Sequence, residues 1–401
     1  MPRPTLLITV TGADRPGLTA ELFEALALPG VEILDLEQVV VRGNLTLSAL
    51  LDPGPSAGAA TAAAHTVGLR LGLSVTCVNG TGDNRRRRPG QLHVTLIGSP
   101  LLPVAVAAIA ARLADRGANI DRIARLARWP VTAVEFDVSG DDAGTLRRDL
   151  TEHAVAHRVD VAVSPAGLAR RGRRLVVMDV DSTLIQDEVI ELLAAHAGRA
   201  EQVAAVTERA MRGELDFTAS LHERVAALAG LPASVFDEVR AEVRLTPGAR
   251  TLCRTLGRLG YTLAVVSGGF LEIVGPLAAS LGIHHVQANR LDVVDGRLTG
   301  RVLGEVVDRA GKAAALRRFA AAEGLPLSRT VAIGDGANDL DMLAEAGLGI
   351  AFNAKPVVRA QADTAVNVPY LDTVLYLLGI PRDEVLEADE EDPVPAHPRP
   401  A

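Results

Sequence analysis

Residues 170–185 read RRGRRLVVMDVDSTLI, and this stretch decides the fold of the larger part of the chain. The short apolar run Leu175–Met178 predicts a buried strand, and the polar turn Asp179–Thr183 follows it directly. Beyond Pro247 the pattern alternates between strands and helices, as in YTLAVVS, FLEIVGPLAASLG, TVAIGDG and LGIAF. Such alternation predicts an α/β fold with a doubly wound, Rossmann-like parallel sheet that helices cover on both faces.

The segment between the first strand and this alternation has helical periodicity broken by glycines. We therefore expect a catalytic core over residues 170–187 and 246–382, with a small helical cap over residues 188–245. An insert at this point would lie over the carboxyl ends of the strands, where open α/β sheets bind their ligands.

The first 165 residues contain an internal repeat, because similar strand and helix patterns recur 86 residues apart, at Gly12 and Gly98. Each copy has the order βαββαβ, which predicts two α+β plaits over residues 1–84 and 91–166, joined by a linker at 85–90. The opening TGADRPGLTAELF resembles the ACT domain, a small ligand-sensing module. This resemblance implies an effector loop at Gly17, although plaits that serve only dimerisation remain an alternative.

Polar residues at four places follow predicted strands or begin a helix, and together they predict one site: Asp179 and Asp181, Ser267 to Gly269, Lys312, and Gly334 to Asp339. Three of the carboxylates, those of Asp179, Asp181 and Asp335, would repel one another in one crevice, and a hard cation would relieve that repulsion. Ligands that are oxygen atoms only favour Mg²⁺.

The remaining groups of this site would bind an oxyanion: the ammonium of Lys312, the hydroxyl of Ser267 and the backbone N–H groups of Gly268 and Gly269. Carboxylates, a metal ion and these donors around one point predict phosphoryl transfer. Hydrolysis of phosphate monoesters requires accelerations of up to about 10²¹, whereas general acid–base catalysis supplies about 10² to 10⁴. We therefore expect Asp179 to form an aspartyl phosphate and Asp181 to act as general acid and then base.

The motifs DVDST, SGG, the isolated lysine and GDGANDLDM closely resemble those of the haloacid dehalogenase-like hydrolases, over about residues 170–379. Within that superfamily, DSTLIQDEVIELLA, MRGELDFTASLHERVAAL and VQANRL…DGRLTGRV resemble the phosphoserine phosphatases. This resemblance implies a Mg²⁺-dependent hydrolysis of O-phospho-L-serine, the last step of serine biosynthesis, with possible feedback by L-serine at the ACT-like domains. A phosphatase of another small phosphate or of phosphoproteins, with plaits purely for dimerisation, is the alternative.

The same resemblance implies how the cap would select the substrate. Glu188 would face the amino group of phosphoserine, and Arg224 would bind its carboxylate. Met211 and Phe217 would close over the site and exclude water.

Further polar residues lie close to these motifs. Asn338 would contact phosphate or serine, and Asp339 would orient Lys312 or a metal-bound water. We expect Asp341 to lie on a helix surface, and His284 and His285 to be satisfied by local partners rather than to bind a metal.

Composition excludes several classes of function. The chain has 401 residues, 3% aromatic residues and a formal charge of −8, and seven carboxylates lie between Asp383 and Asp392. Few aromatic residues argue against a base-stacking surface, and we expect the basic run Arg85 to Arg88 to be a solvated linker. We expect the tail, residues 383–401, to be disordered.

We expect a cytoplasmic homodimer without a nucleic-acid or membrane partner. Two cysteines, Cys77 and Cys253, do not form a metal or redox motif. The N-terminal apolar run is too short for a signal peptide, and no stretch approaches the roughly 20 apolar residues of a membrane span.

Overall fold

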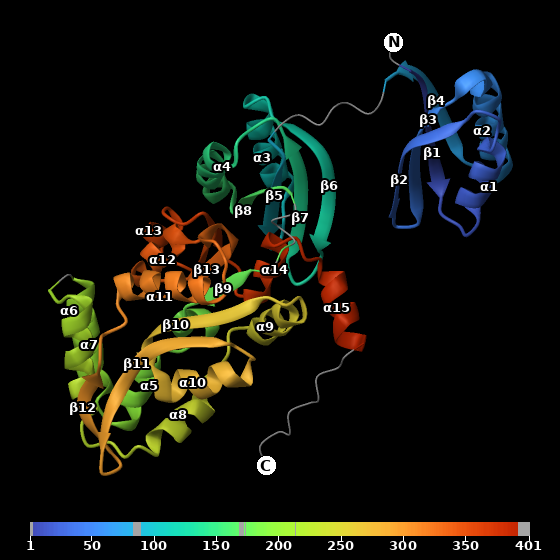
Figure 1. Cartoon of the computed structure of the whole chain (residues 1–401). Coiled ribbons are helices and arrows are strands. Elements are labelled where there is room, and N and C mark those ends of the chain that lie inside the picture. Colours follow the sequence, from blue (N-terminus) through green and yellow to red (C-terminus); the bar gives the residue numbers. More distant parts are fainter. Residues whose placement is uncertain (1–2, 83–89, 168–171, 173, 213, 392–401) are drawn as a thin grey trace. The chain divides into compact units, whose positions relative to one another are not determined.

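The structure, a computed structural model, describes residues 3–82, 90–167, 172, 174–212 and 214–391. It divides into two compact units, residues 1–87 and residues 88–401 (Figure 1). The predicted linker at Arg85 to Arg88 and the last ten residues of the predicted tail lie outside the described residues.

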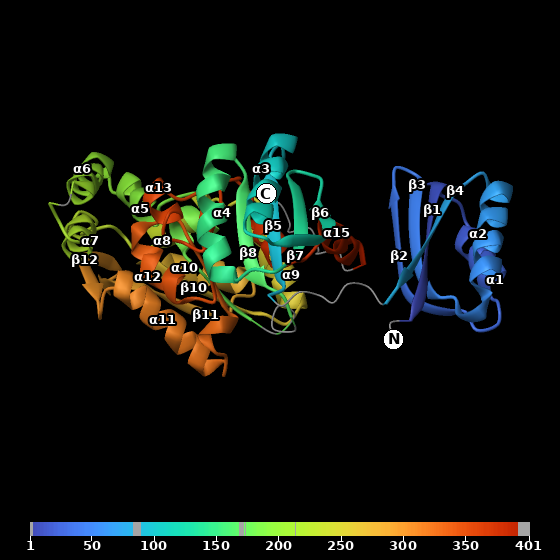
Figure 2. The ribbon, with the colours of Figure 1, turned by 90° about the horizontal axis from the view of Figure 1, so that it is seen from above.

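The first unit is a plait with a four-stranded antiparallel sheet of order β2-β3-β1-β4. Its elements are β1 (Pro4–Ala13), α1 (Leu18–Leu26), β2 (Glu32–Val41), β3 (Asn44–Asp52), a short turn η1 (Gly54–Ser56), α2 (Ala57–Leu71) and β4 (Ser74–Thr81). In β1 the side chains of Leu6, Ile8 and Val10 are buried, whereas Leu7 between them is exposed. One face of the sheet therefore packs on α1 and α2, as Figure 2 shows, and the predicted order βαββαβ is confirmed.

The second unit begins with the second plait, whose sheet has the equivalent order β6-β7-β5-β8. Its elements are β5 (Leu92–Gly98), α3 (Pro103–Asp115), β6 (Asn119–Ala127), β7 (Thr132–Ser139), α4 (Ala143–His157) and β8 (Asp160–Pro165). Leu92, Val94 and Leu96 of β5 pack on the two helices, so this plait has a core of its own.

A seven-stranded sheet of order β12-β11-β10-β9-β13-β14-β15 follows the second plait along the chain. Its strands are β9 (Leu175–Met178), β10 (Thr262–Phe270), β11 (His285–Val294), β12 (Arg297–Leu303), β13 (Thr330–Gly334), β14 (Leu348–Phe352) and β15 (Thr364–Val366). All neighbouring pairs are parallel except β11 and β12, which form an antiparallel hairpin at one edge. The predicted doubly wound fold is confirmed.

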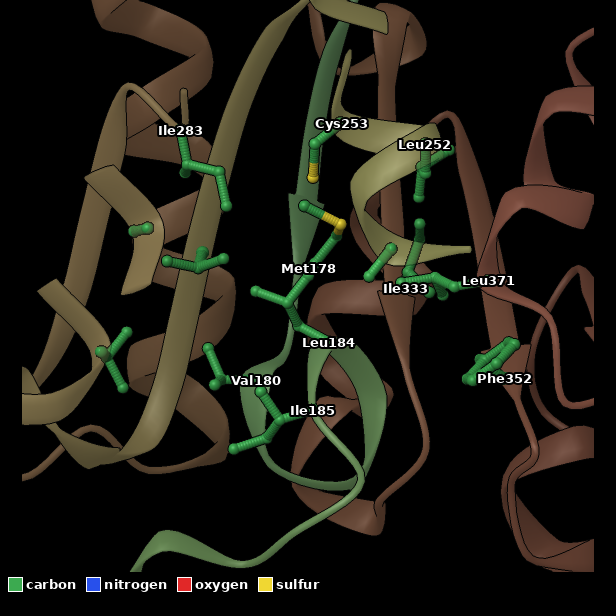
Figure 3. Packing of buried hydrophobic residues seen from close by; sticks show 14 of the residues in the cluster. Met178, Val180, Leu184, Ile185, Leu252, Cys253, Ile283, Ile333, Phe352 and Leu371 are labelled. Atoms are coloured by element: carbon green, nitrogen blue, oxygen red, sulfur yellow. The ribbon is translucent and has the colours of Figure 1, made fainter. Parts of the chain in front are cut away.

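Helices cover both faces of this sheet because its central strands are apolar on both sides. One face carries α9 (Ala249–Arg258), α10 (Leu271–Ser280) and α14 (Val374–Leu377), and the other carries α11 (Arg309–Ala322), α12 (Leu340–Glu345) and α13 (Pro356–Arg359). Each face of the sheet has its own buried hydrophobic cluster. Met178 of β9 packs with Cys253 and Ile333 in the cluster under α9, α10 and α14, as Figure 3 shows, whereas Val177 packs in the cluster on the other face. The cysteines are free, and Cys253 is buried.

The cap is a group of four helices inserted between β9 and α9: α5 (Val189–His196), α6 (Ala200–Met211), α7 (Phe217–Ala226) and α8 (Val235–Glu242). The chain leaves and re-enters the core through paired segments, because Ile185 bridges Leu245 and the N–H of Gln186 donates to Arg244 O at 2.9 Å. This pairing fixes the cap at the carboxyl end of β9.

The second plait, which the sequence predicts as a domain of its own, shares a hydrophobic core with the catalytic sheet. Ile97, Ala133 and Ala162, on the face of its sheet opposite α3 and α4, belong to the same buried cluster as Met178. The hydroxyl of Thr364 in β15 also donates to the carbonyl oxygen of Val161 in β8 at 2.8 Å. The second plait and the catalytic body are therefore one packed unit.

The prediction of a disordered tail is wrong for its first part, since α15 (Arg382–Glu391) is a helix. Arg254 and Arg258 of α9 both form ion pairs with Asp389, and Val385 is buried in the same hydrophobic cluster as Met178. Partners of opposite charge thus order a segment whose composition alone favours disorder. Among the described residues, we find no helix that is long and apolar enough to cross a membrane.

Candidate active site

The loop after β9 lies at the centre of the sheet, between β10 and β13. Asp179 is the first residue after the strand, and its N–H donates to Ile333 O at 2.9 Å. The chain then makes one wide turn, Val180–Leu184, in which Ser182 has a left-handed backbone with φ 57°. This turn brings the carboxylates of Asp179 and Asp181 to the same end of the sheet, where both line one cavity.

Lys312 is completely buried and lies between two carboxylates. Its Nζ is 2.8 Å from Oδ1 of Asp179 and 2.7 Å from Oδ1 of Asp339. The helix that carries it, α11, is capped by the preceding residue, Asp308, whose side chain accepts a hydrogen bond from the N–H of Gly311 at 2.7 Å. Burial alone would lower the pKa of Lys312, but the two carboxylates outweigh burial and hold the pKa above its usual value. The ammonium therefore stays charged where it can neutralise Asp179.

Asp335 and Asp339 follow β13 and complete a group of carboxylates. Oxygen atoms of Asp179, Asp335 and Asp339 all lie within 4.8 Å of one another. Thr183 Oγ1 donates to Oδ1 of Asp335 at 2.9 Å, and the N–H of Gly336 donates to Oδ2 of Asp339 at 2.9 Å. Burial and the nearby charge of Asp339 raise the pKa of Asp335 to about 6, and the same two causes raise the pKa of Asp179 well above its usual value.

The carboxylate of Asp181, which the sequence predicts to be a metal ligand, has other partners in the structure. Its Oδ1 accepts a hydrogen bond from the N–H of Val189 at 2.8 Å, and its Oδ2 accepts one from Ser267 Oγ at 3.0 Å. Asp339, rather than Asp181, is the third carboxylate of the close group. The difference arises from side-chain direction, which the spacing of two residues in a loop does not determine. Burial raises the pKa of Asp181.

Ser267 and the two glycines after it lie within β10, the strand beside β9. The N–H of Gly269 donates to Ser267 Oγ at 2.8 Å and so orients this hydroxyl. A side chain at either glycine would crowd the site: a Cβ at Gly269 would lie 2.8 Å from Oδ2 of Asp181, and one at Gly268 would lie 3.1 Å from Cζ of Phe217. The two glycines thus let the acid and the cap approach the strand closely.

The cap contributes a carboxylate and a guanidinium to the same cavity. Ser182 Oγ donates to Oε1 of Glu188 at 2.7 Å, which ties this first cap residue to the loop of Asp179. Burial and the charge of Asp181 raise the pKa of Glu188 to about 7. Burial lowers the pKa of Arg224, whose Nε donates to Ser220 O at 3.4 Å.

Core and cap together enclose a cavity of about 660 Å³. The predicted site residues that line it are Asp179, Asp181, Glu188, Phe217, Arg224, Gly268, Gly269, Asp335 and Asn338. Ser267, Lys312 and Asp339 lie behind this wall, in contact with the lining carboxylates. The side chain of Met211 is not among the described parts of the chain, and Gly17 belongs to the first unit, where it precedes α1 with φ 88°.

Sequence reasoning missed several residues of this site. Arg309 and Lys355 line the cavity. Arg309 forms an ion pair of 2.5 Å with Asp341, which lies on the surface of α12 as expected. Asn289 is buried in β11, where it donates to Gly268 O at 2.8 Å and accepts from the N–H of Val307 at 2.8 Å. The signal for Lys355 was present, since it follows the strand LGIAF as the other site residues follow theirs.

The two histidines singled out in the sequence have local partners, as expected. His284 Nδ1 accepts a hydrogen bond from the N–H of Leu263 at 3.2 Å, and His285 Nε2 is 2.7 Å from Oε1 of Glu323. His285 also stacks on Phe319, so neither ring is available to the cavity.

The donor set fits a hard divalent cation. Five carboxylates line the cavity against three cationic side chains, and the described lining residues include neither His nor Cys. Both oxygens of Asp339 already accept from Lys312 and Gly336, whereas Asp179 and Asp335 each accept at Oδ1 only among the described contacts. Asp179 and Asp335 are therefore the carboxylates that could hold the ion.

Comparison with known proteins agrees with this geometry. The haloacid dehalogenase-like hydrolase family matches residues 176–344, and ACT domain families match residues 4–62 and 92–164. A phosphoserine phosphatase of Streptomyces coelicolor is 63% identical over 388 residues, which are 96% of this chain and 95% of that protein. Phosphoserine phosphatase SerB2 of Mycobacterium tuberculosis is 52% identical over 393 residues, 97% of this chain and 96% of that protein. A solved structure of a probable phosphoserine phosphatase from Vibrio cholerae is 35% identical with a TM-score of 0.58, and the match covers 75% of this chain and 88% of that one.

Proposed function

The chain belongs to the phosphoserine phosphatase family, and we propose on this basis that it hydrolyses O-phospho-L-serine to L-serine and inorganic phosphate. The observation that carries the proposal is the buried ion pair of Asp179 and Lys312, at a cavity to which the cap adds Glu188 and Arg224. The core thus offers a nucleophile for phosphorus, and the cap offers opposite charges for the two ends of an amino acid.

Asp179 is the nucleophile in this proposal. Lys312 and the N–H of Val180 both contact its Oδ1, which orients the carboxylate at the cavity. The new bond joins a carboxylate oxygen of Asp179 to phosphorus as the bond from phosphorus to the serine oxygen breaks. The positive charge of Lys312 lowers the repulsion between this carboxylate and the phosphate, which would otherwise oppose the approach.

Asp181 is the general acid and base. Burial raises its pKa and so favours the protonated form, which would give its proton to the departing serine oxygen. In the second step the carboxylate takes a proton from a water molecule as that water attacks the aspartyl phosphate, and inorganic phosphate leaves. Ser267 and the N–H of Val189 hold both oxygens of Asp181, which fixes the direction of this proton transfer.

Asp179 and Asp335 would hold Mg²⁺, because their carboxylates belong to the close group and Mg²⁺ prefers oxygen ligands. When bound, the ion would neutralise phosphate charge and so stabilise the transition state.

The substrate is selected by two cap residues. Glu188 would bind the ammonium of phosphoserine, and a cation there favours the ionised form of a carboxyl whose pKa is otherwise about 7. Arg224 would form paired hydrogen bonds with the substrate carboxylate.

The two plaits are proposed to bind an amino acid, L-serine, and to join two copies of the chain. Two matches to the ACT domain support the first part, as does open space around the α-carbon of Gly17. Ile33, Val39 and Val41 lie exposed on β2, an edge strand, which supports association between copies. Calorimetry with L-serine and sedimentation of the full chain test these two parts separately.

Phosphate release from phosphoserine, measured with and without Mg²⁺ and with added L-serine, tests the proposed function. Turnover is expected only with the metal, and Asp179→Asn should abolish it while the melting temperature stays close to that of the parent chain. Full activity of this variant, or an aryl phosphate hydrolysed far better than phosphoserine, would contradict the proposal.

A further inference from the structure

Lysine is nearly absent from this chain. Of its 41 lysine and arginine residues, only two are lysines, Lys312 and Lys355. Both belong to the catalytic cavity: Lys312 contacts Asp179 from behind the wall, and Lys355 lines the cavity itself. All other lysine or arginine positions of the chain are arginine, whereas these two carry the compact ammonium group, which binds phosphate as a point charge.

Lys355 lies on the core side of the cavity. It is the third residue after β14, and β14 is the neighbour of β13, which ends one residue before Asp335. The sheet order therefore places Lys355 beyond Asp335 and on the opposite side of Asp179 from Ser267. Arg224, in contrast, comes from the cap. A phosphate in contact with Asp179 lies between the core groups, so Lys355 is on the phosphate side of the substrate.

Charge compensation separates Lys355 from the other basic side chains of the site. Lys312 is neutralised by two carboxylates, and Arg309 is paired with Asp341. Lys355 is exposed, and it has no ion-pair partner in the part of the chain that the structure describes. An uncompensated ammonium beside a cavity for a phosphate dianion is a binding group for that dianion.

We propose that Lys355 is a substrate-binding residue that contacts the phosphate group of the substrate and of the released product. This inference rests on the proposed function for the identity of the substrate. It assigns to the phosphate a second lysine, one that is accessible from the cavity.

The segment that carries Lys355 is held in place by the second plait. Lys355 is the residue before α13, and Arg359 at the end of α13 donates to Oδ1 of Asn367 at 2.9 Å. Asn367 in turn donates its N–H and its Nδ2 to the carboxylate of Asp160 in β8, at 2.7 and 2.6 Å. Arg147 of α4 forms a 2.5 Å ion pair with Asp363, in the same segment. Arg147 and Asp160 are thus positioning residues for the loop of Lys355.

The scarcity of lysine makes a direct chemical test possible. An amine-acylating reagent applied to the full chain with Mg²⁺ should modify Lys355 and the chain's α-amino group, whereas fully buried Lys312 should not react. Mass spectrometry should show that saturating inorganic phosphate slows the acylation of Lys355 by on the order of tenfold, with the α-amino group as the unaffected control. Equal rates with and without phosphate would overturn the proposal.

Variants of Lys355 separate phosphate binding from binding of the serine part. Lys355→Met should raise KM by on the order of tenfold for both phosphoserine and p-nitrophenyl phosphate with little change in kcat, because loss of a charged hydrogen bond weakens binding of the group that the two substrates share. Lys355→Arg should restore part of this loss. An unchanged KM, or a loss confined to phosphoserine, contradicts the assignment.

The positioning role predicts a smaller effect. Arg147→Met should raise KM and reduce the protection of Lys355 by phosphate, whereas Arg148→Met, an exposed neighbour on α4, is the matched control. If the parent chain shows phosphate protection of Lys355 but does not hydrolyse phosphoserine, the proposed function fails and the assignment of Lys355 stands.

Discussion

Replacing Gly269 with alanine should slow catalysis without unfolding the protein. Gly269 is not among the glycines with positive φ, so alanine fits the backbone there. The new Cβ, however, would lie 2.8 Å from Oδ2 of Asp181 and 3.0 Å from Ser267 Oγ. An ordinary contact would require the acid to move by roughly half an ångström.

The size of the effect follows from this displacement. A misplacement of about 1 Å in a catalytic group can cost about a hundredfold in rate, so we expect kcat for phosphoserine to fall by on the order of tenfold. The loss should be smaller with p-nitrophenyl phosphate, whose leaving group departs readily without a proton and so depends less on the acid in the first step. Steady-state kinetics on the two substrates, with melting temperatures of parent and variant, measure both quantities.

Gly268→Ala is the matched control for this experiment. Its Cβ would meet only the far end of the Phe217 ring at 3.1 Å, so this change should alter the closing of the cap and hence KM more than kcat. An unchanged kcat in Gly269→Ala, or equal losses on both substrates, would refute the assignment of Asp181 as an acid held against this strand.

Three further predictions concern the cap, the two plaits and a buried cysteine. Arg224→Met should lower kcat/KM for phosphoserine by on the order of tenfold to a hundredfold through the loss of a charged hydrogen-bond donor, while p-nitrophenyl phosphate is hardly affected; equal losses would remove the selectivity argument. Deleting residues 1–90 should leave a folded, active enzyme, whereas deleting residues 1–166 should expose the apolar partners of Ile97 and cause a marked drop in melting temperature or aggregation, as calorimetry and light scattering would show. Burial raises the pKa of the Cys253 thiol to about 12, so at pH 8 it should be protonated and unreactive with iodoacetamide until the protein unfolds; rapid alkylation of the folded chain would contradict this.

The sequence predicts the fold and most of the site because both depend on order along the chain. Apolar runs of four or five residues that alternate with helices predict a parallel sheet, and the carboxyl ends of its strands meet at one edge. The loops of Asp179 and Asp335 had to come together for this reason, as the structure shows.

Side-chain direction within a loop is not determined in this way. The pattern Asp-Val-Asp predicts the same role for Asp181 as for Asp179. In the structure, the N–H of Val189 and the hydroxyl of Ser267, both outside this loop, donate hydrogen bonds to the carboxylate of Asp181. Asp339 joins the close group of carboxylates because Lys312, 27 residues earlier, lies between it and Asp179. Partners that are distant in the sequence decide both outcomes.

The sequence contains a weak sign that the second plait packs against the catalytic body. In β1 the apolar side chains alternate with more exposed ones, whereas β5 contains the neighbours Leu96 and Ile97, which are both buried although they point to opposite faces. A strand that is apolar on both sides predicts cover on both sides. The helix α15 left no such trace, since its order comes from Arg254 and Arg258 in a remote part of the chain.

Because only the second plait shares a core with the catalytic body, the two plaits differ in how readily each could be replaced by a plait from another protein. A chimaera that received a foreign plait in place of residues 1–87 would need only a donor that folds by itself, because the cluster around Leu6 and Ile8 contains residues of that plait alone. A transplant in place of the second plait would also have to match the catalytic body at Ile97 and Asp160. New ligand specificity is therefore easier to graft at the amino-terminal copy than at the one fused to the enzyme.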